Sequence, residues 1–163
     1  MTVVADTSAI CYAILIGCED LLPKLFGRVH IPQAVRAELT AAEAPRRVLA
    51  WMQNPPEWLV VETVQGGGDA DLARLDSGER ETLLLAIELR SDVVLLDEKA
   101  ARQVAAARGL RVTGLLGILS EAASLGMVDL PGAVERLRQT NFRASPAMLR
   151  DLLLRHVGKS PEP

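Results

Sequence analysis

Two aspartates each follow a short apolar segment of the kind that forms a β-strand. Asp6 comes directly after Thr2–Ala5, and Asp97 comes directly after Val93–Leu96. Aspartate is a good N-cap residue, so either one could simply begin a helix. If both segments belong to one sheet, however, the two carboxylates meet at the same edge and repel each other unless a cation compensates them. Mg²⁺ and Mn²⁺ prefer oxygen ligands, so the pair indicates a divalent-metal site.

Glutamates in the predicted helices are less easily interpreted. Glu38 lies within a predicted helix over residues 33–42, where a glutamate is ordinarily a solvated surface residue. Glu79 stands three positions after Asp76, the spacing of a capping box, and capping is the simpler interpretation for it. Glu81 lies two positions further along, so it points to another side of the same helix, toward the sheet edge if Glu79 is a cap.

Short β-type segments alternate with longer helical patterns along the chain. The predicted strands are residues 2–5, 29–31, 58–61, 93–96 and 111–113. The predicted helices are residues 8–16, 21–26, 33–42, 45–53, 76–90, 98–108, 115–125, 131–139 and 145–157. This alternation predicts an α/β fold, a three-layer α/β/α sandwich with a mainly parallel central sheet. We expect a single domain over residues 1–157 and a frayed tail over residues 158–163. In such sheets the site lies beyond the carboxyl ends of the strands.

The composition is that of a globular chain, since 49% of its 163 residues are hydrophobic and 24% are charged. Only 3% are aromatic, which argues against a stacking platform for single-stranded nucleic acid. No apolar run approaches the roughly 18 residues of a membrane span, and the first residues lack the basic start of a signal peptide. Cys11 and Cys18 would lie roughly 10 Å apart on one helix, too far for a disulfide. We therefore expect a reduced, cytoplasmic protein without a membrane segment.

Charge is unevenly distributed along the chain, whose net charge is −3. Residues 131–163 carry six basic and three acidic side chains, whereas the rest of the chain is acidic. A mildly basic C-terminal segment could steer RNA toward an acidic body. An ordinary solvated helix face explains the same pattern equally well.

Other phosphate and metal chemistries lack their motifs. The sequence contains no Gly-x-x-x-x-Gly-Lys-Ser/Thr loop for binding nucleotide phosphates. A haloacid-dehalogenase-type phosphatase needs a second aspartate two positions after Asp6, and that position is Ser8. His30 and His156 lack the spacing to cysteines or acids that a zinc site requires.

Several segments taken together resemble the PIN-domain family. The first two segments, Asp6–Ser8 and Val29–Leu39, resemble the opening of a PIN domain. An uncharacterised prokaryotic PIN-like subfamily, related to VapC-type toxin ribonucleases, is similar at Asp76–Glu81, Leu95–Arg102 and Gly109–Leu119. The similar segments fall in order and with fitting spacing over about residues 2–155.

The resemblance implies a metal-dependent endoribonuclease that uses Mg²⁺ or Mn²⁺, most often the toxin of a toxin–antitoxin pair. The acidic residues of the family, which are both catalytic and metal-binding, fall on Asp6, Glu38, Glu81 and Asp97. Glu79 is the rival of Glu81 for the third position, and Glu98 is the alternative to Asp97 for the fourth.

The resemblance also implies supporting residues and partners. Thr7 and Ser8 match the small hydroxyl position that orients the first aspartate. Apart from the resemblance, the basic residues Lys99 and Arg102, one turn further on, are candidates for binding the RNA backbone, although a surface charge beside Glu98 is an equally good interpretation. The expected partners are an RNA substrate, an antitoxin protein and a second copy of the chain in a homodimer. The alternative is a catalytically silent PIN-like protein with a binding or regulatory role.

Overall fold

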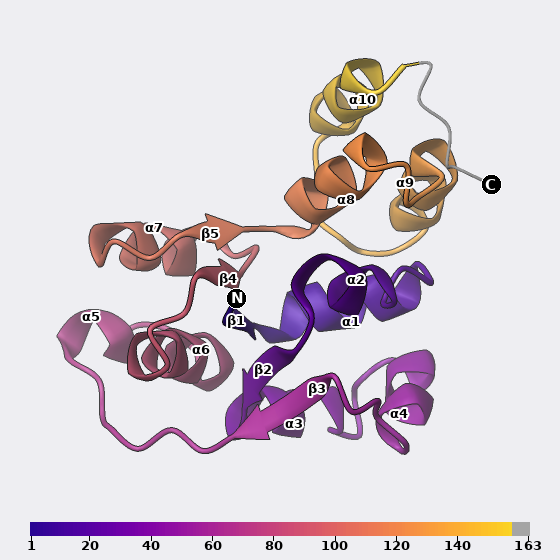
Figure 1. The fold of residues 1–163 in the computed structure, drawn as a ribbon. Coiled ribbons are helices and arrows are strands. Elements are labelled where there is room, and N and C mark those ends of the chain that lie inside the picture. The colour runs from indigo at the N-terminus through magenta and orange to yellow at the C-terminus, as the bar shows by residue number, and fades with distance from the viewer. Residues whose placement is uncertain (158–163) are drawn as a thin grey trace.

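Five short strands form one sheet in the computed structural model, which describes residues 1–157 (Figure 1). The spatial order is β3-β2-β1-β4-β5, and every neighbouring pair is parallel. The strands are β1 (Val3–Ala5), β2 (Val29–Pro32), β3 (Leu59–Glu62), β4 (Val93–Leu95) and β5 (Val112–Thr113). The central strands β1 and β4 are buried along their whole length, as their unbroken apolar runs require of parallel strands covered on both faces. The predicted frayed tail, residues 158–163, lies outside the described residues.

Helices cover both faces of the sheet, so the predicted three-layer α/β/α fold is confirmed. One face carries the larger apolar core, which includes Val3, Ala5 and Leu95. Its helices are α1 (Thr7–Leu15), α2 (Leu21–Phe26), α3 (Gln33–Leu39), α4 (Arg46–Met52), α8 (Leu115–Ser124), α9 (Leu130–Arg138) and α10 (Pro146–Arg155). The opposite face, with Val4 and Leu96, packs against α5 (Ala70–Ala73), α6 (Ser77–Glu88) and α7 (Lys99–Ala107).

The strand order contains a switch point between β1 and β4. From β1 the chain moves outward to β2 and β3, and it then crosses to the other side of β1 to form β4 and β5. Sheets of this kind bind ligands beyond the carboxyl ends of the strands at the switch point. Ala5 is paired with Leu95, and the Asp6 amide donates a hydrogen bond to the Leu95 carbonyl at 2.9 Å. The fold therefore places the residues that follow β1 and β4 at one edge.

The three C-terminal helices pack together beyond the sheet edge formed by β5 (Figure 1). They remain part of the larger core, because α8 contacts both α1 and α2. The segment between α9 and α10 returns to α1, where the Tyr12 hydroxyl donates to Asn141 Oδ1 at 2.6 Å. This return brings residues from the end of the chain next to the first helix.

Some local features differ from the sequence-based predictions. The helix predicted over residues 33–42 ends at Leu39, and the Thr40 hydroxyl donates back to the Arg36 carbonyl at 2.8 Å. The short helix α5 was not predicted; its N-cap is Asp69, whose side chain accepts from two backbone amides. Cys11 and Cys18 are free, and Cys18 lies beyond the end of α1. Over residues 1–157, no helix is long and apolar enough to cross a membrane.

Candidate active site

Asp6 stands at the N-cap position of α1 but does not cap it. Its side chain makes no cap hydrogen bond, and the residue is only 4% exposed. The pKa of this carboxyl is raised from its ordinary value to about 7, chiefly by burial and also by the charges of Asp76, Glu38 and Asp97, against the lowering effect of the Thr7 amide. A buried acid surrounded by acids is costly unless a cation compensates it. Capping therefore does not account for Asp6.

Asp97 also differs from a simple helix cap. Glu98, not Asp97, occupies the N-cap position of α7. Asp97 Oδ1 instead accepts a hydrogen bond from the Leu115 amide, at the start of α8, at 3.0 Å. Asp97 Oδ2 is buried and has no hydrogen-bond partner among the residues that the structure describes. Burial raises the pKa of Asp97, while the Leu115 amide and the Arg102 charge lower it.

Gly114 makes room for the Asp97 carboxyl. A β-carbon at position 114 would collide with Asp97 Oδ1 and would also press on the Arg102 guanidinium. The backbone amide of the next residue can approach Asp97 because this position is glycine. Asp97 is thus fixed through one oxygen, and its second oxygen remains available for a ligand.

Glu38 reaches the site from α3. The Thr7 hydroxyl donates a hydrogen bond to Glu38 Oε2, which ties α3 to the start of α1. A β-carbon at Gly78 would lie 2.5 Å from Glu38 Oε1, so the carboxyl rests against the start of α6. Thr7 therefore orients Glu38 in this structure, whereas the resemblance had implied that it orients Asp6.

The start of α6 contributes two further acids. Asp76 Oδ1 accepts from the Glu79 amide at 2.8 Å, which confirms the capping contact predicted from their spacing. The same two carboxylates also belong to the acidic group. The charge of Asp76 raises the pKa of Asp6, and the pKa of Glu79 is raised by burial and then by the charges of Asp76 and Asp6. From the sequence, Asp76 was assigned only a capping role. The signal that could have placed it in the site is that it is the N-cap of α6, the helix that leads into β4.

Glu81 is directed elsewhere. Its Oε1 accepts a hydrogen bond from the Ala34 amide, at the start of α3, at 3.3 Å. The structure brings Glu79 into electrostatic contact with Asp6, whereas the Glu81 carboxyl is bound to the start of α3. A role for Glu81 as a metal ligand stays a prediction, and the observed arrangement favours its rival.

The carboxylate oxygens of these acidic residues are ligands that a divalent cation prefers, although the carboxyl groups of residues 1–157 do not converge on one point. Within residues 1–157, no three side chains of His, Cys, Asp or Glu are close enough to form a complete cation site. Asp6, Asp76, Asp97 and Glu38 interact electrostatically at longer range. Mg²⁺ keeps several waters and is commonly held by one or two carboxylates together with substrate phosphates, so a complete protein cage is not required. The unpartnered Asp97 Oδ2 is an oxygen of the kind that such an ion needs.

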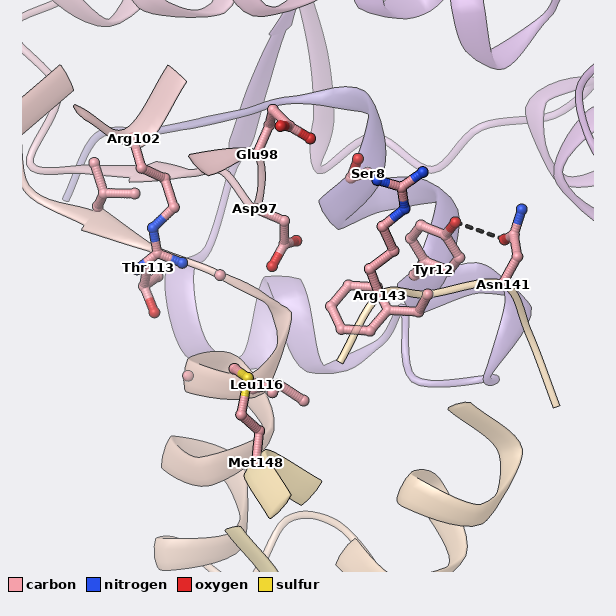
Figure 2. A pocket seen from close by; sticks show the side chains of 14 residues that line it. Ser8, Tyr12, Asp97, Glu98, Arg102, Thr113, Leu116, Asn141, Arg143 and Met148 are labelled. Atoms are coloured by element: carbon pink, nitrogen blue, oxygen red, sulfur yellow. Dashed lines mark hydrogen bonds between the residues drawn. The ribbon is translucent and has the colours of Figure 1, made fainter. Parts of the chain in front are cut away.

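A cleft of about 500 Å³ lies beside Asp97 (Figure 2). The side chains of Ser8, Glu98 and Arg102 line it, but the buried Asp6 does not. Lys99 is exposed and lines a shallower depression, which Asp97 and Arg102 also line. The two hydroxyl residues singled out in the sequence therefore have different roles, since Thr7 donates to Glu38 and Ser8 lines the cleft.

Comparisons with known proteins agree with this geometry. A family model described as a PIN domain matches residues 2–158. Neither the curated proteins nor the solved structures yielded a match. PIN domains are typically nucleases and generally use divalent metal ions. Because the match covers nearly the whole chain, the chain belongs to the PIN-domain family.

Proposed function

We propose that this chain is a ribonuclease that hydrolyses RNA phosphodiester bonds with Mg²⁺ or Mn²⁺. The observation that carries the proposal is Asp6, an acid 4% exposed at the switch point of the sheet, whose pKa is raised to about 7 by burial and by neighbouring acids. Acids whose pKa is strongly perturbed by burial and by neighbouring charges are characteristic of functional sites. Within residues 1–157, Asp6 neither caps its helix nor pairs with a cationic side chain, so no structural contact there offsets this cost.

The residues that would hold the metal are Asp6 and Asp97, with Glu38 and one of the α6 glutamates. A bound divalent ion supplies charge neutralisation at the phosphate and a lower pKa for an attacking water. The chain orients its own acids for this purpose: the Thr7 hydroxyl holds Glu38, and the Leu115 amide holds Asp97. Glu98 offers a further carboxylate at the cleft.

Cleavage of labelled single-stranded RNA under a titration of Mn²⁺ tests the proposal. The wild-type chain should cut RNA, and Asp6→Asn should lose at least about a hundredfold in rate, because several kcal/mol of metal-dependent stabilisation is removed. Asp20→Asn is a matched control, since Asp20 is also a helix N-cap without a cap hydrogen bond but is exposed. Equal rates for Asp6→Asn and Asp20→Asn would refute the catalytic assignment.

We further propose that the activity is that of a VapC-type toxin in the cytoplasm, neutralised by an antitoxin, and that the chain forms a homodimer. Family membership supports the toxin role. Exposed apolar side chains near the C-terminal helices, at Leu125, Leu154 and Val157, support association. Light scattering should give about twice the 17.6 kDa of one chain. A mass of one chain at micromolar concentration would contradict the dimer.

A catalytically silent RNA-binding role is the second candidate. It is favoured by the lack of three converging metal-binding side chains within residues 1–157. RNA binding without cleavage at any Mn²⁺ or Mg²⁺ concentration would select this role over the nuclease.

A further inference from the structure

The segment between α9 and α10 is fastened to the helix that follows Asp6. The Tyr12 hydroxyl donates to Asn141 Oδ1 at 2.6 Å, and the Tyr12 and Phe142 rings meet edge to face with centroids 5.1 Å apart. The Phe142 amide donates to the Thr140 hydroxyl at 3.2 Å, which closes the turn locally. Contacts of this number fix a short segment that would otherwise be free to move over the surface.

Arg143 follows directly and enters the cleft beside Asp97. Figure 2 shows its side chain extending into the same cleft as Asp97 and Ser8. Its guanidinium makes no hydrogen bond and no ion pair with any residue from 1 to 157. By contrast, Arg108 is paired with Asp69 at 2.5 Å, and the Arg136 Nε donates to the Ile16 carbonyl at 2.7 Å. Burial raises the pKa of Tyr12 and the charge of Arg143 lowers it, so the guanidinium lies near the Tyr12 hydroxyl. Its hydrogen-bond donors, however, are not used by any contact within residues 1–157.

The position of this charge matters because the site is otherwise acidic. A phosphodiester strand is an anion, so its approach to Asp97 and the acids behind it is repulsive unless cations line the path. Among residues 1–157, the cations that line the cleft are Arg102, on α7, and Arg143, from the far end of the chain. Arg102 lies close enough to Asp97 to lower the pKa of that carboxyl, so its charge is already engaged. The guanidinium group suits phosphate because it donates two parallel hydrogen bonds.

We infer that Arg143 binds a phosphate of the RNA strand, and that Tyr12 is a positioning residue that holds the Arg143 segment over the cleft. This inference rests on the proposed function, since it identifies how the substrate strand is held at the same site. It also assigns a role to the aromatic pair of Tyr12 and Phe142, which the metal site does not need.

Binding of a fluorescently labelled single-stranded RNA oligomer by the full chain, followed by anisotropy over a salt titration in chelator, tests Arg143. The Asp6→Asn chain is the parent, because it removes a repelling charge and prevents turnover. Arg143→Ala should weaken binding about tenfold and reduce the slope of log affinity against log salt by about 0.7 to 1, as expected when one phosphate contact is lost. Arg46→Ala is the matched control, since Arg46 is exposed on α4 and does not line the cleft; it should leave the slope unchanged.

Arg143→Lys should retain the salt slope while losing part of the affinity, because lysine keeps the charge but not the paired donors. The inference is overturned if Arg143→Ala has the slope of its parent, or if the parent shows no RNA binding. A loss of slope equal to that of Arg46→Ala would also overturn it, because the effect would then reflect overall charge.

The role of Tyr12 is tested by a double-mutant cycle. Tyr12→Phe keeps the ring contact with Phe142 and removes the hydrogen bond to Asn141. It should weaken RNA binding several-fold when Arg143 is present and have no further effect in the Arg143→Ala chain. If Tyr12 acts only by positioning Arg143, the two substitutions are coupled and their effects do not add. An equal effect in both backgrounds would show that Tyr12 acts on the fold in general and not through Arg143.

These outcomes separate from those of the proposed function. If the wild-type chain cuts RNA in Mn²⁺ and Arg143→Ala retains the parent slope, the nuclease stands and the Arg143 inference falls. If the chain does not cut RNA but its salt slope depends on Arg143, the Arg143 inference stands and the catalytic assignment falls.

Discussion

The starts of α1 and α9 carry the same residue type at the same position and use it in opposite ways. Asp129 at the start of α9 is exposed, and its side chain accepts a hydrogen bond from the Gly132 amide, an ordinary cap. Asp6 at the start of α1 is buried, makes no cap hydrogen bond and interacts with other acids. One aspartate stabilises its helix, while the other is held at an energetic cost. This difference indicates most clearly that the site at the carboxyl end of β1, where Asp6 lies, has a functional role.

The largest expected effect in this comparison is the pH dependence of stability at Asp6. Its pKa is raised from 3.8 to about 7, so the folded chain binds this proton more tightly than the unfolded chain does. The contribution to stability is therefore fully present below pH about 4 and is lost as the pH rises to about 7. Asp6→Asn removes the titration, so in chelator its free energy of unfolding should exceed that of wild type above pH 7, by at most about 4 kcal/mol, and match it near pH 4.

Urea unfolding at pH values on both sides of this interval measures the difference. A constant difference across the interval would show that the ionisation of Asp6 is not its cause. A less stable Asp6→Asn chain at every pH would instead give Asp6 a structural role like that of Asp129.

The next effect concerns Gly114, the residue before α8. There the first amide of the helix, that of Leu115, donates to Asp97, which belongs to another part of the sheet edge. Gly114→Ala would place a β-carbon against the Asp97 carboxyl, so either Asp97 or the start of α8 must move. We expect a loss of about 1–3 kcal/mol in stability, as for other overpacked sites, together with weaker Mn²⁺ binding. Gly67→Ala is the control, because a β-carbon there has nothing within 4 Å. Calorimetry with Mn²⁺ provides the readout, and unchanged binding would remove Asp97 from the ligands.

A smaller effect should distinguish the two glutamates of α6. Glu79 has a raised pKa from burial and from Asp76 and Asp6, whereas Glu81 accepts from the Ala34 amide. Glu79→Gln should weaken Mn²⁺ binding about tenfold or more, the usual effect of disturbing a group beside a metal. Glu81→Gln should be nearly silent, because the amide oxygen can still accept from Ala34. The reverse result would restore Glu81 as the third acid.

The smallest effect is expected at Asp129 itself. Asp129→Ala should lower the free energy of unfolding by about 1 kcal/mol or less, whereas Asp129→Asn should be nearly silent because asparagine caps equally well. RNA cleavage should be unchanged in both variants. A change in cleavage would contradict the distinction between the two helix starts, and thermal unfolding measured beside the cleavage rate would reveal it.

The sequence alone determined the fold class and two of the acids. Unbroken apolar runs bounded by helical patterns predict parallel strands, and a residue that follows such a strand must lie at the carboxyl edge of the sheet. Asp6 and Asp97 could therefore be placed without any knowledge of packing. The family resemblance then indicated Glu38, which the structure places against Thr7 and Gly78.

Only the tertiary structure decided which remaining side chains join that edge. Glu79 and Glu81 point to different sides of α6, and the rotation of α6 about its axis decides which of them faces Asp6. The packing of Leu83 and Ala86 against the sheet sets this rotation, not the local spacing of the two residues. Arg143 lies about 140 positions from Asp6 in the chain, yet it lines the cleft next to the contact between Tyr12 and Phe142. Contacts between such distant segments depend on how helices close over a core, which no local pattern of residues encodes.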